Sequence, residues 1–450
     1  MNDEIAKNSP GRRNTETKHD GDGRPLPAGL PHIAYILLWY PLFTQPFIFR
    51  EVEILRRRLP LEVYSLYASN PRCCSKEMLA ALPSTRTAGL KLLPAFLLET
   101  ARCLFTKPAM FRRLFIRSLC RPWRSLESFA ENLWAFLAGV YLGRQLREDG
   151  IDMIYAPWPR GTATAAWVAA EIAGIPFGTS ARGDNLDPAD PDLGAKFSAA
   201  LFIRANNAHD MKRIENFNQG QAKGKVELIY NSLTLPLATR RQETVLSKKT
   251  ARLLALGRFD VTKGFDVLLH ACHLLKESGL DFHLTLAGGG GKVMGLGRMG
   301  RTLANLRKEL GLKELVSMPG FVSHDSLPDI LLSHDIFLAP CVVHESGRRD
   351  GIPNTIIEAM AYGLPVIGTS VNALPEVILD NTTGLLVPPG NADALADAIR
   401  RLVAHPEDAR CMGQNGMALA EEMFDTDRNC RRLSDLLVRQ NARWKASCAA

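Results

Sequence analysis

The sequence predicts an α/β protein built from two Rossmann-like, doubly wound domains, and three observations support this prediction. The chain has 450 residues, which is too long for one compact core. Apolar residues make up 46% and charged residues 23%, a composition typical of globular proteins and not of disordered or fibrous ones. In each half, apolar β-branched runs alternate with helical patterns, and a polar connector separates the halves.

The first half begins with a strand, a helix and a second strand. The predicted strand 32–40 (HIAYILLWY) is apolar and aromatic, the helix 47–58 (FIFREVEILRRR) follows it, and LEVYSLY forms the next strand from residue 61. IDMIYAPW, TATAAWVAAEIAG and FGTSA continue the alternation as strand, helix and strand. The short connections favour a parallel sheet.

The same alternation starts afresh near residue 253. Asn391 stands before an acidic first turn, where an N-cap is expected. The predicted strands are RLLALG, FHLTLAG, IFLAPC, LPVIGTS and TGLLVPP, and the predicted helices are FDVLLHACHLLKESG, RTLANLRKELGL and NADALADAIRRLV.

These patterns divide the chain into five segments. They are a disordered lead-in (1–29), a first domain (30–235), a linker (236–250), a second domain (251–422) and a C-terminal helix (423–450). The lead-in lacks the apolar stretch of a signal peptide, and no run reaches the ~18 apolar residues of a spanning helix. Nine cysteines without the paired spacing of a zinc site are expected to be reduced. We therefore expect a cytoplasmic protein.

The net charge of +8 indicates an anionic partner, and its distribution separates the candidates. Residues 90–124 hold eight Lys or Arg and one Glu among many Leu and Phe. Such segments predict helices lying on an anionic bilayer surface, and helices packed on the sheet with a solvated basic face are the alternative. No zinc finger, RNP-type aromatic motif or basic zipper accompanies the charge, so nucleic acid is not expected.

Two basic residues follow the first strand of the second domain. Gly257 and Arg258 end that strand, and Lys263 stands five residues later at the start of a helix. A guanidinium and an ammonium at such a turn can hold a diphosphate. The glycine run 288–291 is compatible with a phosphate loop or with an ordinary turn. The dinucleotide and P-loop fingerprints are absent after the first strands, which argues against dehydrogenases and P-loop enzymes.

Two carboxylates flank the start of another helix after the strand IFLAPC. Pro353 fits a first helical turn, which places Asp350 in the preceding loop and Glu358 about one turn inside. Carboxylates accept hydrogen bonds from vicinal hydroxyl groups, so ribose and hexose are candidate ligands. The alternative is an ordinary core helix, in which Glu358 caps the helix or forms an ion pair and Asp350 only interacts favourably with the helix dipole.

The order of motifs resembles a known enzyme family. LGRFDVTKGFDVLLHA, LAGGG, MPGFVS, HDIFLAP, DGIPNTIIEAMAYGLPVIGTS, LPEVI and TGLLVPPGNADALADAI are similar to the C-terminal half of retaining family-4 glycosyltransferases of the GT-B fold. AYILLWYPLFTQPFIFREVEIL resembles the opening of the exopolysaccharide, colanic-acid-type branch. The similarity covers residues 32–420 and implies two domains that face each other across a cleft.

The resemblance implies roles for the second domain's residues. Arg258 and Lys263 match the basic pair that holds the donor diphosphate, and Glu358 matches the glutamate that takes the ribose hydroxyls. Asp350 stands where the family usually has its first glutamate, near the reaction centre, and a similar Asp-Gly-Ile-Pro-Asn variant occurs within the branch. The backbone from Gly351 to Asn354 is expected to lie against sugar and phosphate.

The first domain departs from the family pattern at one position. In the segment GTSARGDNLDP, Arg182 stands where family members usually carry a histidine. An arginine cannot act as a base near neutral pH, but it can stabilise a departing diphosphate; a structural ion pair with a nearby aspartate is the alternative. Thr44, Gln45 and Glu51 follow the first strand and are candidate acceptor contacts, or else a cap and a solvated helix face.

The resemblance implies a retaining glycosyltransferase that moves a hexose-type sugar from a UDP- or GDP-sugar to a saccharide acceptor. A lipid-linked acceptor of bacterial exopolysaccharide or other surface-glycan synthesis is expected, with the enzyme peripheral on the inner face of the cytoplasmic membrane. No metal or other cofactor is expected, since Arg258 and Lys263 supply the charge. A soluble acceptor, or an impaired protein that only binds nucleotide sugar, are the alternatives.

Overall fold

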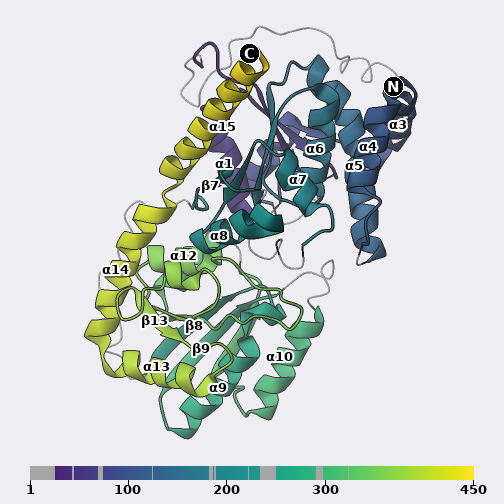
Figure 1. Ribbon diagram of the computed structural model, residues 1–450. Helices are drawn as coiled ribbons and strands as arrows, with labels where there is room; N and C mark the ends of the chain where they lie inside the picture. The colour runs from purple at the N-terminus through teal and green to yellow at the C-terminus, as the bar shows by residue number, and fades with distance from the viewer. Residues whose placement is uncertain are drawn as a thin grey trace, which may run out of the picture. The chain divides into compact units, whose positions relative to one another are not determined.

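The computed structural model describes residues 26–42, 45–68, 74–123, 125–181, 186, 189–220, 222–233, 250–289, 297–322 and 324–449. These residues form two compact units (Figure 1). The first contains the chain up to Asn206 with Asp210–Ser232 and Asp427–Ala450, and the second contains Asn207–His209 and Leu233–Thr426. Most of the expected lead-in (1–29) and of the expected linker (236–250) lies outside the described residues.

The first unit is built on a parallel sheet. Its described strands have the order β3-β2-β1-β4-β5-β6-β7, so the order reverses between β1 and β4. Ile33 of β1 pairs with Leu61 of β2 on one side and with Met153 of β4 on the other. The predicted doubly wound class is confirmed for this half. The strands are β1 (Ile33–Leu37), β2 (Leu61–Ser65), β3 (Thr85–Thr87), β4 (Met153–Ala156), β5 (Phe177–Ala181), β6 (Phe202–Ala205) and β7 (Val226–Leu228).

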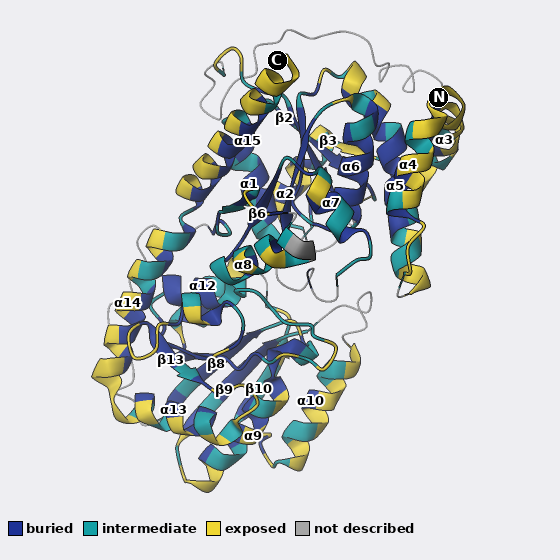
Figure 2. Ribbon diagram, viewed as in Figure 1, coloured by how far each residue is buried: buried dark blue, intermediate teal, exposed yellow. Residues whose placement is uncertain are grey.

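Helices cover this sheet, and most strands are buried, while most of the helices have one buried and one exposed face (Figure 2). This alternation of buried and exposed positions is the helical pattern seen in the sequence. The helices are α1 (Pro46–Arg56), α2 (Lys76–Ala80), α3 (Leu93–Thr106), α4 (Pro108–Ser118), α5 (Leu126–Glu148), α6 (Gly161–Ala173), α7 (Leu193–Ala199), α8 (Ala208–Asn216) and α15 (Thr426–Ala449).

Helix α5 is a long element that the sequence patterns did not predict. Gly139 and Gly143 let it approach α6 closely, because a Cβ at Gly139 would lie 2.7 Å from the carbonyl oxygen of Ala165. Its other side packs against α3, where the ring of Phe96 lies 5.1 Å from that of Trp134. Because α5 is buried on two sides, it has no single apolar stripe for a sequence pattern to reveal.

The C-terminal helix α15 packs on the first unit. Leu433, Leu436 and Leu437 are fully or almost fully buried in the same core cluster as Ile33 and Tyr35 of β1. At the surface, α15 adds ion pairs from Arg439 to Glu227 (2.9 Å) and from Lys445 to Asp152 (2.6 Å). The last helix therefore completes the core of the unit that contains the first strand.

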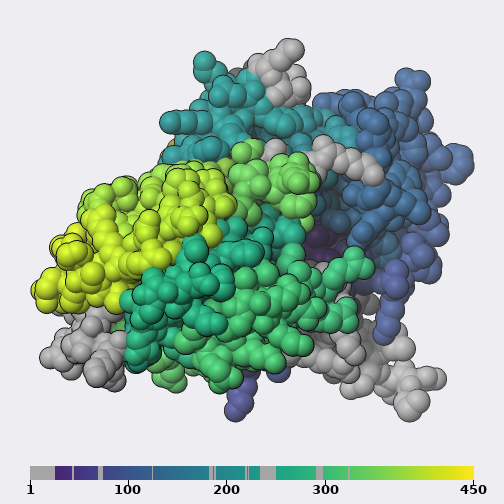
Figure 3. Space-filling view, turned by 90° about the horizontal axis from the view of Figure 1, so that it is seen from below, coloured from purple at the N-terminus to yellow at the C-terminus, as the bar shows by residue number. Residues whose placement is uncertain are grey.

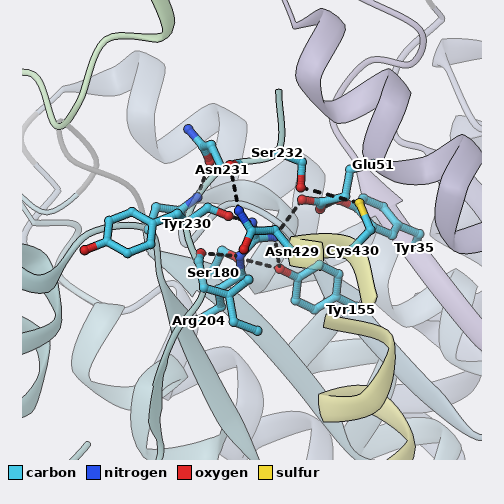
Figure 4. Close-up of polar contacts among 12 residues, drawn as sticks. Tyr35, Glu51, Tyr155, Ser180, Arg204, Tyr230, Asn231, Ser232, Asn429 and Cys430 are labelled. Carbon is cyan, nitrogen blue, oxygen red and sulfur yellow. Dashed lines mark hydrogen bonds and ion pairs between the residues drawn. The ribbon is translucent and has the colours of Figure 1, made fainter. Parts of the chain in front are cut away.

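A buried ion pair links four segments of the first unit (Figure 4). The Arg204 guanidinium donates to the Glu51 carboxylate at 2.6 Å and to the carbonyl oxygens of Ile229 and Tyr230 at 2.9 and 2.8 Å. The Tyr35 hydroxyl donates to the other Glu51 oxygen at 2.6 Å. Both charged side chains are at most 1% exposed, so each depends on the other to offset its loss of hydration.

The second unit is also a doubly wound parallel sheet, as predicted. Its described strands have the order β10-β9-β8-β11-β12-β13, and the order reverses between β8 and β11. Figure 3 shows the outer surface that α9, α10, α13 and α14 give this unit, in teal green to yellow green. The elements are β8 (Ala251–Gly257), α9 (Phe265–Glu277), β9 (Phe282–Gly288), α10 (Gly297–Glu309), β10 (Val316–Gly320), α11 (Leu327–Leu332), β11 (Ile336–Ala339), α12 (Asn354–Ala361), β12 (Val366–Thr369), β13 (Gly384–Val387), α13 (Ala392–Ala404) and α14 (Pro406–Phe424).

One local prediction for this unit is confirmed in detail. The side chain of Asn391 accepts a hydrogen bond from the backbone N–H of Ala394 at 2.9 Å and caps α13. This cap satisfies an N–H group that the first helical turn leaves without a backbone partner.

The buried ion pair generates a stability prediction. Arg204→Met leaves Glu51 charged and without its ionic partner, so we expect the free energy of unfolding to fall by about 3–5 kcal/mol. Arg439→Met breaks a half-exposed pair and should cost less than about 1 kcal/mol. Urea unfolding followed by circular dichroism measures both losses, and equal losses in the two variants would contradict a structural role for the buried pair.

Candidate functional site

Two loops of the second unit meet at the carboxyl ends of β8 and β11, where the strand order reverses. The loop after β8 contains a 3₁₀ turn (Val261–Lys263), and the loop after β11 leads to α12. The backbone N–H of Val342 donates to the carbonyl oxygen of Thr262 at 2.9 Å and ties the loops together. In open parallel sheets, this edge is where ligands bind.

Asp260 shapes the loop after β8. Its carboxylate accepts hydrogen bonds from the backbone N–H and the hydroxyl of Thr262 at 3.1 and 3.0 Å, and it pairs with Arg348 at 2.8 Å. Burial alone would raise the pKa of Asp260, but the bonds from Thr262 and Arg348 outweigh it and hold the pKa below its usual value. The turn is therefore braced by a permanent negative charge.

Lys263 and Asp350 form the central contact of the site. The ammonium lies 3.0 Å from Oδ2 of Asp350, which also accepts a hydrogen bond from the Thr262 hydroxyl at 3.3 Å. Burial tends to lower the pKa of Lys263, but the Asp350 charge outweighs it, and the pKa is raised above the ordinary value. Lys263 therefore stays protonated, and the pair fixes the Asp350 carboxylate beside the turn.

The residue after Lys263 must be a glycine. Gly264 has φ +62°, and a Cβ there would lie 2.0 Å from the carbonyl oxygen of Pro340. Only glycine combines this backbone conformation with such a close approach of the two loops. Gly264 thus lets α9 begin directly behind the Lys263 ammonium.

Arg258 supplies an accessible cation beside this pair. Its side chain is exposed, and the guanidinium forms no hydrogen bond or ion pair with any residue in the described part of the chain. Its charge is near enough to oppose the protonation of Lys263. An exposed guanidinium next to a buried ammonium is suited to an anionic ligand with several oxygens.

Glu358 differs from the other acidic groups of the site. It lies one turn inside α12, and its carboxylate has no hydrogen bond or ion pair to another described residue. Although part of its surface is open to water, protein atoms surround it closely, and this burial raises its pKa to about 7. A carboxylate that is poorly hydrated and unpaired is ready to accept hydrogen bonds from a ligand.

The structure brings the predicted residues of the second domain into one region. Gly351 and Asn354 flank the start of α12, as the position of Pro353 predicted, and Asp350 ends the loop before them. Asn372 adds a contact that the sequence patterns missed: its amide donates to the carbonyl oxygen of Asp350 at 2.5 Å.

Sequence reasoning also missed Asp260, Thr262 and Arg348. A local signal existed for the first two, because Asp260 followed by Thr262 has the spacing of a helix N-cap. Arg348 carried no local signal, since it meets Asp260 only through the folding of the chain.

The predicted residues of the first domain have different outcomes. Arg182 and Thr44 lie outside the described residues. Gln45 occupies the N-cap position of α1, partly exposed, and its side chain makes no capping hydrogen bond. The assignment of Glu51 as an acceptor contact is corrected: the carboxylate is 1% exposed and is held by Arg204 and Tyr35, so its role is structural.

Among the described residues, no group of three or more His, Cys, Asp or Glu side chains is arranged to hold a metal ion. No helix in the described ranges is long and apolar enough to cross a membrane.

Comparison with known sequences places the site in a family context. Residues 238–418 match the family model described as "Glycosyl transferases group 1". The chain is 32% identical over 188 residues to the amylovoran biosynthesis glycosyltransferase AmsK of Erwinia amylovora, which covers 42% of this chain and 44% of the relative. It is 34% identical over 147 residues to the putative colanic acid biosynthesis glycosyltransferase WcaL of Escherichia coli K12, covering 33% of this chain and 34% of the relative.

A third relative is named for a glycolipid substrate. The GDP-mannose-dependent alpha-(1-6)-phosphatidylinositol monomannoside mannosyltransferase of Mycolicibacterium smegmatis is 30% identical over 186 residues, which is 41% of this chain and 47% of the relative. In all three comparisons the matched stretch spans less than half of the relative's length.

Solved structures of low sequence identity share the fold across most of the chain. Sucrose-phosphate synthase from Thermosynechococcus elongatus has a TM-score of 0.68 at 18% identity, covering 92% of this chain and 99% of that one. Anabaena Alr3699/HepE in complex with UDP and glucose has a TM-score of 0.64 at 16% identity, covering 90% and 99%. These likenesses establish the GT-B fold.

The raised pKa of Glu358 predicts a pH-dependent cost to stability. Between about pH 4.5 and pH 7 the unfolded chain has released this proton and the folded chain retains it, so the free energy of unfolding falls as pH rises. The total loss is on the order of 3 kcal/mol. Glu358→Gln avoids it, and we expect the variant to gain stability over the parent between pH 5 and pH 8 in urea unfolding.

Glu407→Gln is the matched control, because Glu407 is 80% exposed. Its stability difference from the parent should stay nearly constant over the same pH range. If Glu358→Gln behaved in the same way, the carboxyl would have an ordinary pKa and the argument from burial would be wrong.

Proposed function

Because residues 238–418 of this chain belong to the group 1 glycosyltransferases, we propose that the protein transfers a hexose-type sugar from a UDP- or GDP-sugar to a saccharide acceptor. The observation that carries the proposal is the set of charges at the switch point of the second sheet. Among the described residues, Arg258 is an exposed cation without an ion pair, and Glu358 is a carboxylate without one. A nucleotide diphosphate has the complementary groups, with anionic oxygens at one end and ribose hydroxyls at the other.

Each charged group has a separate task in this proposal. Arg258 and Lys263 take the diphosphate oxygens, and their charge stabilises the anion that departs when the bond to the sugar breaks. The ionised Glu358 accepts hydrogen bonds from the two ribose hydroxyls. Both interactions need no metal ion.

Asp350 acts on the transferred sugar. Its carboxylate is held by Lys263 and Thr262, and the contact from Asn372 fixes its backbone, so the side chain keeps one orientation. Preorganised groups of this kind place a sugar hydroxyl without loss of entropy in the reaction itself. Gly351 and Asn354, at the start of α12, offer backbone groups to sugar and phosphate.

The chemical step that we propose is a transfer with retention. The bond from the anomeric carbon to the diphosphate oxygen breaks, a bond from the acceptor hydroxyl oxygen forms on the same face, and the acceptor proton passes to the departing diphosphate. The products are the glycosylated acceptor and a nucleoside diphosphate. Arg182 remains a proposed stabiliser of that anion.

A lipid-linked saccharide is the proposed acceptor. Two relatives are named for the synthesis of the exopolysaccharides amylovoran and colanic acid, and a third for a phosphatidylinositol mannoside. One structural neighbour was solved with UDP and glucose. A soluble saccharide acceptor, or a protein that binds nucleotide sugar without turnover, are the competing possibilities.

A donor panel tests the proposed function. Purified protein is incubated with uridine and guanosine diphosphate sugars and a lipid-linked oligosaccharide, and release of the nucleoside diphosphate is measured. We expect turnover of one donor and a loss of at least about 100-fold in kcat/KM for Asp350→Ala, Glu358→Ala and Arg258→Gln. Arg400→Gln, at an exposed pair on α13, should keep the parent's activity.

The outcomes separate the alternatives. Turnover with a soluble saccharide alone would replace the lipid-linked acceptor, and tight donor binding without any turnover would indicate a binding protein. Unchanged turnover in both Asp350→Ala and Glu358→Ala would show that the site has been assigned wrongly.

The pKa of Glu358 predicts how donor affinity depends on pH. Ribose hydroxyls donate to the ionised carboxylate, so affinity should rise about tenfold from pH 6 to pH 8 as a group with a pKa of about 7 loses its proton. Isothermal titration with the accepted nucleotide sugar measures this change. Glu358→Gln should bind more weakly and with little pH dependence, and a parent affinity that is flat over this range would contradict the ribose contact.

A further inference from the structure

Helix α3 presents an apolar stripe to solvent. The side chains of Leu97, Leu98, Leu104 and Phe105 are 53, 68, 44 and 82% exposed. With the exposed Pro94 and Ala101 they recur every three or four residues, which places them on one side of the helix. Scattered exposed leucines are ordinary on protein surfaces, but a continuous stripe along a whole helix indicates an interaction site.

The opposite side of α3 is fixed in the core, so this stripe cannot simply rotate inward. Phe96 is fully buried, and its ring lies 5.1 Å from Trp134 and 5.2 Å from Tyr141 of α5. Cys103, two turns further along the helix, is 8% exposed on the same buried side. In Figures 1 and 2, α3 lies beside α4 and α5, and Figure 2 colours its exposed side yellow.

Cations flank the stripe at both ends of α3. Lys91 precedes the helix, Lys107 follows it, and Arg112 lies on α4; all three are exposed. None of them forms an ion pair or a side-chain hydrogen bond with another residue of the described ranges. Their positive charge is therefore available to an external partner.

The nearby acidic groups are already occupied. Glu99 on α3 is bound by Arg144 at 2.6 Å, and Glu171 is bound by Arg113 at 2.6 Å. The surface around the stripe thus combines apolar side chains with uncompensated positive charge. This combination matches an interface of hydrocarbon and anionic phosphate.

The neighbouring helix extends the same character. On α4, Ile116 is 51% exposed and Phe115 is 39% exposed. Helix α3 has 14 residues, about 21 Å of helix, which is shorter than the ~30 Å hydrocarbon core of a bilayer. A helix of this length can lie in a membrane interface but cannot cross it.

We propose that the exposed side of α3, with Lys91, Lys107 and Arg112 at its flanks, docks the protein on an anionic lipid bilayer. The helix lies parallel to the membrane, its stripe enters the boundary between headgroups and acyl chains, and the three cations contact lipid phosphates. A protein partner or a second copy of the chain would have to place apolar side chains on the stripe and acidic groups on the three cations. An anionic bilayer offers hydrocarbon and phosphate side by side over its whole surface. The proposal does not rest on the proposed function, because vesicle binding requires no donor and no turnover.

Flotation of the full chain with lipid vesicles tests the proposal. Vesicles of phosphatidylcholine alone are compared with vesicles that contain about 30% phosphatidylglycerol, at low and high salt. We expect the protein to float with the anionic vesicles, more weakly at high salt, and to remain unbound with the neutral ones. No flotation with either composition at low salt would overturn the proposal.

Two sets of substitutions separate the apolar and the charged contributions. Combined Leu97→Ser, Leu98→Ser and Phe105→Ser should reduce partitioning at least tenfold at both salt concentrations. Combined Lys91→Gln, Lys107→Gln and Arg112→Gln should reduce it on the order of 100-fold at low salt and flatten the salt dependence. Parent-like partitioning in either set would contradict docking through α3.

Matched controls exclude general effects of charge and folding. Arg298→Gln, Arg301→Gln and Lys308→Gln remove the same charge from exposed positions of α10, and these changes should leave partitioning within about twofold of the parent. Leu379→Ser removes a side chain that is 41% exposed on the second unit and should have no effect. Circular dichroism melting confirms that each variant is folded.

Light scattering on the protein without lipid tests whether a second copy of the chain covers the stripe. A monomer supports docking of the stripe on a bilayer. A dimer that the serine substitutions dissolve, together with no flotation, would show that a second copy covers the stripe and would overturn the proposal.

Discussion

The buried ion pair between Glu51 and Arg204 is the constraint on which the first unit depends. Arg204 lies on β6, and its guanidinium binds the Glu51 carboxylate on α1. It also donates to the carbonyl oxygens of Ile229 and Tyr230, which follow β7, the last strand of this sheet in the sequence. Just beyond, the Asn429 amide donates to the carbonyl oxygen of Asn231 at 3.3 Å, so the chain is bound at the place where it leaves the unit and where α15 returns to it. A charged pair at this point tolerates only one arrangement, because either charge alone would be buried without a partner.

The second unit uses charge differently at its switch point. Lys263 and Asp350 satisfy each other, and Asp260 satisfies Arg348 and the 3₁₀ turn, so these four side chains make the loops rigid. Glu358 has been left without such a partner among the described residues, and burial raises its pKa to about 7. Burying this unpaired carboxyl lowers the free energy of unfolding, and such a cost is typical of groups in ligand-binding sites. The contrast with Glu51 is one of pairing: Glu51 is held by Arg204, whereas Glu358 has no ionic partner among the described residues.

The basic segment of the first unit illustrates how structure sharpens a compositional signal. Composition indicated a bilayer surface or a packed helix pair, and the structure contains elements of both: Phe96 anchors α3 on α5, while Leu98 and Phe105 on the other side stay exposed. Two of the cations that contributed to the charge count are paired within the described part of the fold, Arg102 with Glu99 and Arg113 with Glu171. Only those without partners can contribute to an external interaction.

The sequence by itself determined the features that depend on local pattern: the alternation of strands and helices, the Asn391 cap, the positions of Arg258 and Lys263 after β8, and the placement of Asp350 and Glu358 around the start of α12. Strand periodicity and capping act within a few residues, so they can be recognised from the chain alone. Tertiary structure decided the burial of Glu51, the two-sided packing of α5 and the pairing of Asp260 with Arg348. These depend on contacts between residues that are distant in the sequence, and the raised pKa of Glu358 depends on the packing around it, which no local pattern encodes.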